Sequence, residues 1–160
     1  MALVELRLSP LPSHVRTARL VGVAAARRAG LAAELVDELR LAIGEACSRA
    51  VGLNARHAPD TPVMITVSDD PGMLVVTVSD VGPAAGPALD DLAGELFDEH
   101  PLPTDPETAQ DGFVHPDVGL AVVAGVVDDC EITPGPTGTT VVMRWPLTSS
   151  PPGATAISRT

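Results

Sequence analysis

The sequence predicts an α+β domain, a two-layer sandwich in which helices cover one face of a mostly antiparallel sheet. Three observations support this prediction. A chain of 160 residues that is 45% hydrophobic is long enough to bury one aliphatic core. Its first part holds two segments with apolar residues three and four apart, the spacing of helices that pack on a core. The rest holds two pairs of short β-rich segments joined by turn residues.

The amino-terminal third predicts one strand and two helices. Residues 3–8 alternate between apolar and charged side chains, as in a strand with one face in water. Ser13 is placed to cap a helix that runs to about residue 29, and Gly30 ends that helix. The second helix is expected from about residue 34 to residue 53.

Two hairpins and a third helix follow in the sequence. The first hairpin pairs residues 63–68 with residues 73–79 through Asp-Asp-Pro-Gly, which has turn chemistry at every position. A helical pattern over residues 117–127 leads into the second hairpin. This hairpin pairs residues 130–133 with residues 139–145 through a turn rich in proline and glycine.

Two segments carry no firm periodicity. Residues 84–113 are rich in Pro, Ala, Gly and acids, with a short helical pattern only at residues 89–97. A loop of this length inside a compact domain is typical of a lid or a binding loop. Residues 148–160 are mostly Ser, Pro, Gly and Thr and predict a disordered tail. We therefore expect a single domain over residues 1–147, with an acidic lid-like loop at residues 84–113.

The composition disfavours several classes of function. The chain has no lysine, a net charge of -11 and an aromatic content of 2%, which argues against nucleic acid as a partner. Cys47 and Cys130 show neither a close pair nor a metal-binding spacing, so we expect both to be reduced core residues. Because the sequence has no leader pattern and no run of about 20 apolar residues, it predicts a cytoplasmic protein without membrane association.

Charge is unevenly distributed along the chain. Residues 1–56 hold eight arginines against five acids, whereas residues 57–143 hold sixteen acids and neither arginine nor lysine. Arg16, Arg19 and Arg27 lie roughly on one side of the first helix. They form either a solubilising stripe or a contact surface for an acidic partner or a second copy of the chain. The acidic stretch is equally consistent with a solvated face and with a docking surface for a basic protein.

The second helix carries the most concentrated set of functional groups. Glu45, Ser48, Arg49 and Gly52 share a face that lies away from its apolar stripe. Glu45 and Arg49 are four residues apart, acid before base, which on its own predicts an exposed ion pair of about 0.2 to 0.5 kcal/mol.

Four short motifs in order resemble a known family. They are Glu45-Ala46 through Arg49-Ala50, then Asp80-Val81-Gly82, Val118-Gly119-Leu120 and Gly138-Thr139-Thr140. This series, over residues 3–147, resembles the histidine-kinase-like ATPase fold, and more narrowly its short branch of anti-sigma factor serine kinases. The resemblance implies a left-handed crossover sandwich that binds ATP between the second helix and a mobile lid. It also implies binding to a sigma factor and, in many members, phosphorylation of a serine on a small antagonist protein.

The resemblance also assigns roles to particular residues. Glu45 takes the place of the acid that activates the nucleophile, and Asp80 that of the carboxylate that binds the adenine amino group. The remaining matches are a turn glycine beneath the base, the end of the phosphate-side loop, and a hydroxyl near the adenine: Gly82, then Gly119 with Leu120, and Thr140. The adenine half of the pocket is therefore expected to be intact.

The departures from the family pattern fall on the phosphate side. Arg49 stands where the family has an asparagine that ligates magnesium, and a guanidinium has no lone pair for a metal. Arg49 could bind phosphates itself or pair with Glu45. Ala84 and Asp117 replace loop glycines, and residues 84–113 contain eight acids without a cation. The sequence thus predicts no metal ligands, with magnesium disfavoured at the usual site and ATP as the candidate cofactor.

The sequence therefore predicts an anti-sigma-factor-like regulatory protein that acts by protein binding and whose ATP site is degraded. Its partners would be a sigma factor, an antagonist protein, or both. Two alternatives stay open: an active ATP-dependent serine kinase with Glu45 as the base, and an adenine-nucleotide sensor without phosphoryl transfer. The sequence also leaves open whether the chain forms a homodimer.

Overall fold

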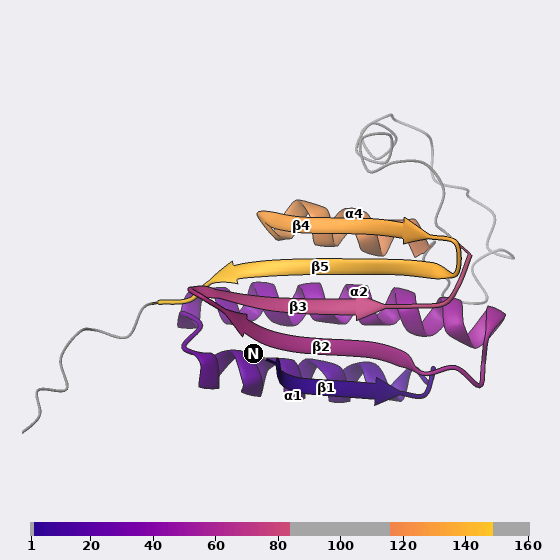
Figure 1. Cartoon of the computed structure of the whole chain (residues 1–160), viewed down its shortest axis with the longest axis horizontal. Helices are drawn as coiled ribbons and strands as arrows, with labels where there is room; N and C mark the ends of the chain where they lie inside the picture. Colours follow the sequence, from indigo (N-terminus) through magenta and orange to yellow (C-terminus); the bar gives the residue numbers. More distant parts are fainter. Residues whose placement is uncertain (1, 84–115, 149–160) are drawn as a thin grey trace, which may run out of the picture.

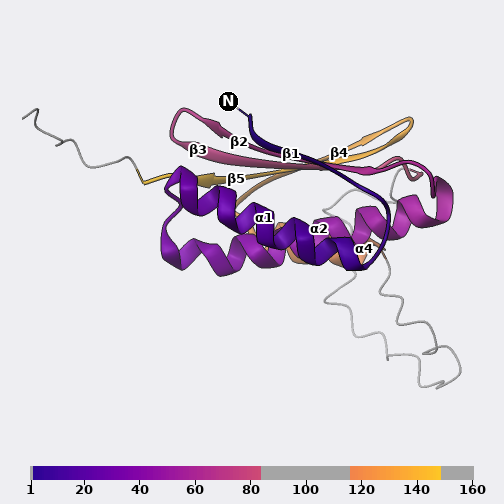
Figure 2. The ribbon, with the colours of Figure 1, turned by 90° about the horizontal axis from the view of Figure 1, so that it is seen from below.

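Five strands form one sheet, and the α-helices among the described residues all lie on one of its faces (Figures 1 and 2). The computed structural model describes residues 2–83 and 116–148. Its elements, in chain order, are β1 (Ala2–Leu8), α1 (Ser13–Ala29), the 3₁₀ helix η1 (Ala33–Leu35), α2 (Val36–His57), β2 (Val63–Asp70), β3 (Met73–Ser79), α4 (Pro116–Val126), β4 (Asp129–Gly135) and β5 (Gly138–Pro146).

The strand order is β1-β2-β3-β5-β4, and every neighbouring pair is antiparallel. The last strand, β5, therefore lies between β3 and β4, and β4 forms the outer edge. Helices α1, α2 and α4 lie together on one side of this sheet (Figure 2). The predicted two-layer α+β architecture is confirmed.

The core lies between the sheet and the helices, and strand alternation decides which residues enter it. In β2 and β3 every second residue is buried: Val63, Ile65, Val67, Leu74, Val76 and Val78. They pack in one cluster with residues of α2 such as Leu39 and Ile43, which are 0% exposed. The alternate residues of these strands stay half-buried on the open face, as is common for antiparallel sheets.

Trp145 of β5 is the largest fully buried side chain in the described part of the chain, with 2% of its surface exposed. Its indole Nε1 donates a hydrogen bond to Glu38 Oε1 of α2 at 2.7 Å. The contact satisfies the single polar group of a buried tryptophan. It also joins the carboxyl end of β5 to the first turns of α2.

Several element boundaries differ from the sequence-based expectation. Ser13 does not cap α1: Pro12, already in helical conformation, occupies the cap position, and no side-chain cap bond forms. Gly30 does end α1, with a positive φ of 92° that favours glycine. Helix α2 continues to His57, beyond the expected end, and both hairpins have tighter turns because their strands extend further than expected.

The expected lid at residues 84–113, its short helical pattern at residues 89–97 and most of the expected tail lie outside the described residues. Thr148, the first residue of that tail, is fixed by a hydrogen bond from its Oγ1 to Gly30 O at 2.8 Å. Among the described residues, no helix combines the length and the hydropathy that a bilayer crossing requires.

The two cysteines are free thiols in different surroundings, and this leads to a first prediction. Burial raises the pKa of Cys47 to about 12. Cys130 is half-buried, and burial together with the neighbouring Asp129 carboxylate raises its pKa as well. Because the thiolate is the reactive form, iodoacetamide at pH 8 should modify Cys130 in the native protein and leave Cys47 intact until the chain unfolds. Peptide mass spectrometry measures both rates, and equal rates in the native protein would contradict this prediction.

The same pKa shift predicts a pH dependence of stability. The unfolded Cys47 thiol ionises near its ordinary pKa of 9.0, whereas the folded thiol stays protonated until about pH 12. Its contribution to the free energy of unfolding is therefore present below pH 9 and is lost progressively between these two values. Replacing Cys47 with alanine should flatten this part of the pH profile.

Candidate functional site

Asp80, directly after β3, is the centre of the candidate site. Its Oδ1 accepts hydrogen bonds from the backbone N–H groups of Gly82 at 3.0 Å and Thr139 at 3.2 Å. Its own N–H donates to Thr139 O at 3.0 Å. These bonds join the end of β3 to the start of β5 and leave the Asp80 side chain 2% exposed.

Arg49 of α2 forms an ion pair with this carboxylate. Its Nη1 lies 2.6 Å from Asp80 Oδ2, and both side chains are only 2% exposed. The expected pairing of Arg49 with Glu45 is therefore wrong. The physical reason is burial: a desolvated guanidinium requires a desolvated counter-ion, whereas Glu45 remains half-buried.

Three buried polar atoms around this pair have no partner among the described residues. They are Arg49 Nε, Arg49 Nη2 and Thr139 Oγ1. Thr139 itself is only 1% exposed and lies beside Asp80 through the two backbone hydrogen bonds given above. Buried polar groups are nearly always hydrogen-bonded, so this cluster differs from an ordinary protein core.

Asn54 is a site residue that the sequence analysis missed. It is 0% exposed, its Oδ1 accepts from Val81 N at 2.9 Å, and its Nδ2 donates to Thr61 O at 3.1 Å. It thereby holds the chain just after Asp80 against the end of α2. The available signal was an amide on the apolar side of a helix, where a buried polar group must find partners.

Two glycines bring backbone close to α2. A Cβ on Gly82 would lie 2.8 Å from Leu53 Cβ. A Cβ on Gly119 of α4 would lie 3.5 Å from Glu45 O, 3.8 Å from Glu45 Oε2 and 3.9 Å from Arg49 Cβ. The structure thus gathers five of the predicted site residues around one stretch of α2: Glu45, Arg49, Asp80, Gly82 and Gly119.

The other two predicted site residues lie elsewhere. Leu120 is 2% exposed and belongs to the core. Thr140 pairs with Ser79, and their hydroxyls lie 3.2 Å apart, whereas the neighbouring Val78 and Val141 face the core. Strand alternation therefore puts Thr140 on the open face, whereas Thr139, whose backbone bonds Asp80, has a buried side chain.

Ala84 and Asp117 are the residues that replace loop glycines of the family pattern. Ala84 lies outside the described residues. Asp117 lies at the start of α4, with its side chain outside the description. Within residues 2–83 and 116–148 there is no group of three or more His, Cys, Asp or Glu side chains able to hold a metal ion.

Comparison with known proteins identifies the family. A sequence model of the histidine kinase-like ATPase domain matches residues 8–145, which is most of the chain. The chain belongs to this family. No curated protein matches its sequence.

Two solved structures are similar to this histidine kinase-like ATPase domain. One is the crystal structure of the RsbU and RsbW domains of Rv1364c from Mycobacterium tuberculosis, with a TM-score of 0.62 and 17% identity. That match covers 92% of this chain and 33% of the other, so the chain spans about a third of its length. The other is the NMR structure of the histidine kinase domain of the E. coli osmosensor EnvZ, with a TM-score of 0.42 and 17% identity over 99% and 98% of the two chains.

Membership of an ATPase domain family suggests an adenine nucleotide as the ligand, and the geometry at Asp80 tests whether one fits. The carboxylate already accepts two backbone N–H groups and one guanidinium, and it is almost fully removed from solvent. A base that donated to Asp80 would therefore compete with Arg49 for Oδ2 and with two backbone N–H groups for Oδ1. In this arrangement the donors of Asp80 come from the chain itself, which disfavours an adenine there.

Proposed function

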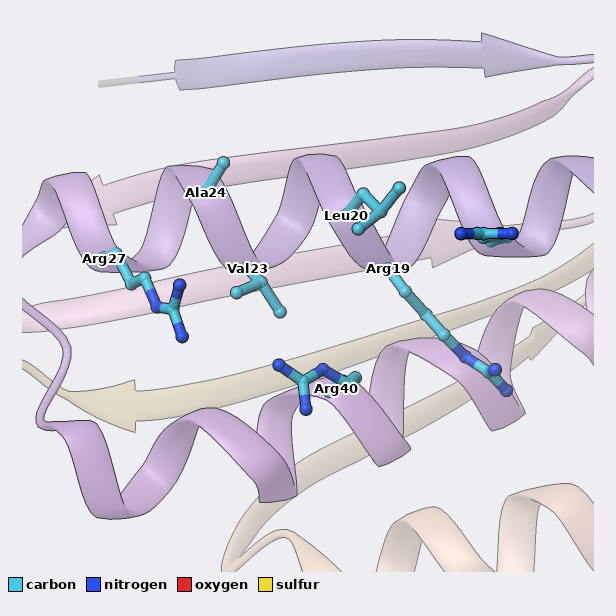
Figure 3. A pocket seen from close by; sticks show the side chains of 7 residues that line it. Arg19, Leu20, Val23, Ala24, Arg27 and Arg40 are labelled. Atoms are coloured by element: carbon cyan, nitrogen blue, oxygen red, sulfur yellow. The ribbon is translucent and has the colours of Figure 1, made fainter.

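We propose that the chain is an anti-sigma-factor-like regulatory protein that acts in transcription control, in the cytoplasm, by binding another protein. The observation that carries this proposal is an arginine-lined groove between α1 and α2 (Figure 3). The groove has a volume of about 330 Å³, and its lining combines four arginines with three small or aliphatic residues: Arg16, Arg19, Leu20, Val23, Ala24, Arg27 and Arg40.

The groove presents both charge and apolar surface to a partner. Leu20 is 62% exposed, which is the largest exposure of any large hydrophobic side chain in the described residues. Arg16, Arg27 and Arg40 are exposed, and Arg40 pairs with Asp37 at 2.8 Å. Such a combination of an apolar anchor with arginines matches the composition of protein interfaces.

Arg19 connects this groove to a second hollow. Figure 3 shows Arg19 extending from α1 toward α2, while Arg27 and Arg40 reach the groove from the two helices. A neighbouring hollow of about 360 Å³ shares Arg16 and Arg19 and continues along the two helices to Ser48 and Gly52. The two hollows together form a basic track along the α1–α2 surface.

A partner for this track should carry acids around an exposed apolar residue. The motif resemblance indicates a sigma factor as that partner, with an antagonist protein as its competitor. Competition for one surface does not require phosphoryl transfer, which agrees with the buried pairing of Arg49 and Asp80. Incubation with labelled ATP and a candidate antagonist tests the rival proposal of an active serine kinase, with Glu45 as the base.

Charge reversal tests the groove directly. We expect Arg16→Glu together with Arg27→Glu to weaken binding to a sigma factor by at least about tenfold, or 1.4 kcal/mol, because both side chains are exposed at the groove. The matched control is Arg28→Glu, which changes an exposed arginine of the same helix that does not line the groove.

Isothermal titration with candidate sigma factors and antagonist proteins measures these affinities. Weaker binding at higher salt should accompany the effect because the arginines are exposed. Equal affinities for the double variant and the Arg28→Glu control would contradict the proposed surface. If the wild-type chain bound none of the candidates, the proposed function itself would be wrong.

A further inference from the structure

We propose that Arg49 acts as a built-in counter-ion that takes the place of a ligand at the Asp80 carboxylate and keeps this site closed to adenine nucleotides. The proposal concerns the internal site between α2, β3 and β5, whereas the proposed function concerns the exposed α1–α2 groove. It rests on the proposed function only in its final consequence, that partner binding does not depend on nucleotide.

The first support is the way the ion pair is built. Arg49 is on α2, Asp80 follows β3, and their nitrogen and oxygen lie 2.6 Å apart with both side chains 2% exposed. The second carboxylate oxygen is held by the N–H groups of Gly82 and Thr139. Three donors from the chain therefore stabilise this desolvated carboxylate without a ligand.

The second support is the set of unpartnered polar atoms beside the pair. Arg49 Nε and Nη2 and Thr139 Oγ1 are buried without a protein partner among the described residues. A buried site shaped only for packing would satisfy or exclude such groups. Unpartnered polar atoms of this kind are expected if Arg49 fills a space that could also hold a polar ligand.

Removing the arginine should therefore open a site of defined chemistry. The opened site would contain the Asp80 carboxylate, the Thr139 hydroxyl and apolar walls from α2 such as Leu53. A carboxylate beside a hydroxyl recognises a group with adjacent N–H donors and an acceptor. The amino edge of adenine has this chemistry.

The test uses the full chain with adenosine and with Mg-ATP as separate probes. We expect neither probe to bind the wild type in isothermal titration or to raise its melting temperature. The variant Arg49→Ala should bind adenosine with an affinity at least about tenfold above the detection limit of the titration. This gain should disappear in Arg49→Ala with Asp80→Asn, and Arg28→Ala, an exposed change on α1 that does not line the groove, should resemble the wild type.

Three results would overturn the proposal. One is Mg-ATP binding to the wild type that Asp80→Asn weakens, which would show that Asp80 is open to the base. Another is Mg-ATP binding to the wild type that Arg49→Ala weakens, which would assign Arg49 to the phosphates. The third is a folded Arg49→Ala variant that gains no affinity for adenosine. If Arg49→Ala did not fold, Arg49→Gln, whose side chain is uncharged and shorter than arginine but fills part of the same space, would replace it in the same titrations.

A separate measurement addresses the link to the proposed function. With a bound sigma factor, saturating Mg-ATP or Mg-ADP should change the dissociation constant by less than about twofold. A larger change would overturn the closed-site proposal even if binding through the arginine groove were established. Failure to find any partner would instead count against the proposed function and would leave the adenosine titrations unaffected.

Discussion

Arg49→Met is expected to lower the free energy of unfolding by about 3 to 5 kcal/mol, the loss typical when one partner of a buried ion pair is removed. Methionine is unbranched and apolar but shorter than arginine, so the change removes the charge together with the outer part of the side chain. The Asp80 carboxylate would then remain 2% exposed with only the two backbone N–H groups as donors. Urea denaturation followed by circular dichroism measures the loss.

A double-mutant cycle separates the ion pair from other effects of the substitution. Asp80→Asn retains a side-chain oxygen that can accept from Gly82 and Thr139. Arg49→Met combined with Asp80→Asn should therefore cost less than the sum of the two single changes. The surface control Arg40→Met, whose partner Asp37 is exposed, should cost only about 0.2 to 1 kcal/mol. Additive losses at Arg49 and Asp80 would contradict a coupled pair.

The identity and order of the elements could be predicted because their signals are local. Apolar spacing identified both long helices, and the turn residues between strands identified both hairpins. The boundaries were less accurate, and so was the role of Asn54, whose side chain bonds the backbone of Val81 and Thr61. The contact with Val81 joins residues 27 apart in the sequence, and periodicity carries no information about it.

Five of the seven residues that the sequence singled out lie near one another, but the ion pair between Arg49 and Asp80 was not predicted. Glu45 is four residues from Arg49 along one helix, whereas Asp80 is 31 residues away. Local spacing therefore favoured Glu45, but folding buries Arg49 beside Asp80 and makes that carboxylate its partner. The threonines show the same limit: a shift of one residue in a strand moves a side chain to the opposite face, so Thr139 reaches the site and Thr140 does not.

Gly138→Ala should have the second large effect, because Gly138 allows β5 to start against the Asp80 backbone. Its φ is 151°, outside the range that residues with a Cβ readily adopt. A Cβ there would collide with Asp80 O and would lie 2.7 Å from Asp80 C and 2.9 Å from Val81 Cα. Backbone strain should cost about 1 to 3 kcal/mol, and overpacking a similar amount. Together they should lower the free energy of unfolding by roughly 2 to 6 kcal/mol.

Gly72→Ala is the matched control for this prediction. Gly72 also has a positive φ, 81°, at the turn of the first hairpin, but a Cβ there would meet nothing within 4 Å. Gly72→Ala should therefore lower the free energy of unfolding only by the conformational cost of about 1 to 2 kcal/mol. The two variants can be compared by urea denaturation and by hydrogen exchange of the Thr139 amide. Faster exchange of that amide in Gly138→Ala alone would place the damage at the contact with Asp80, because its N–H bonds Asp80 Oδ1. Equal losses for the two variants would show that the close approach to Asp80 contributes nothing to stability.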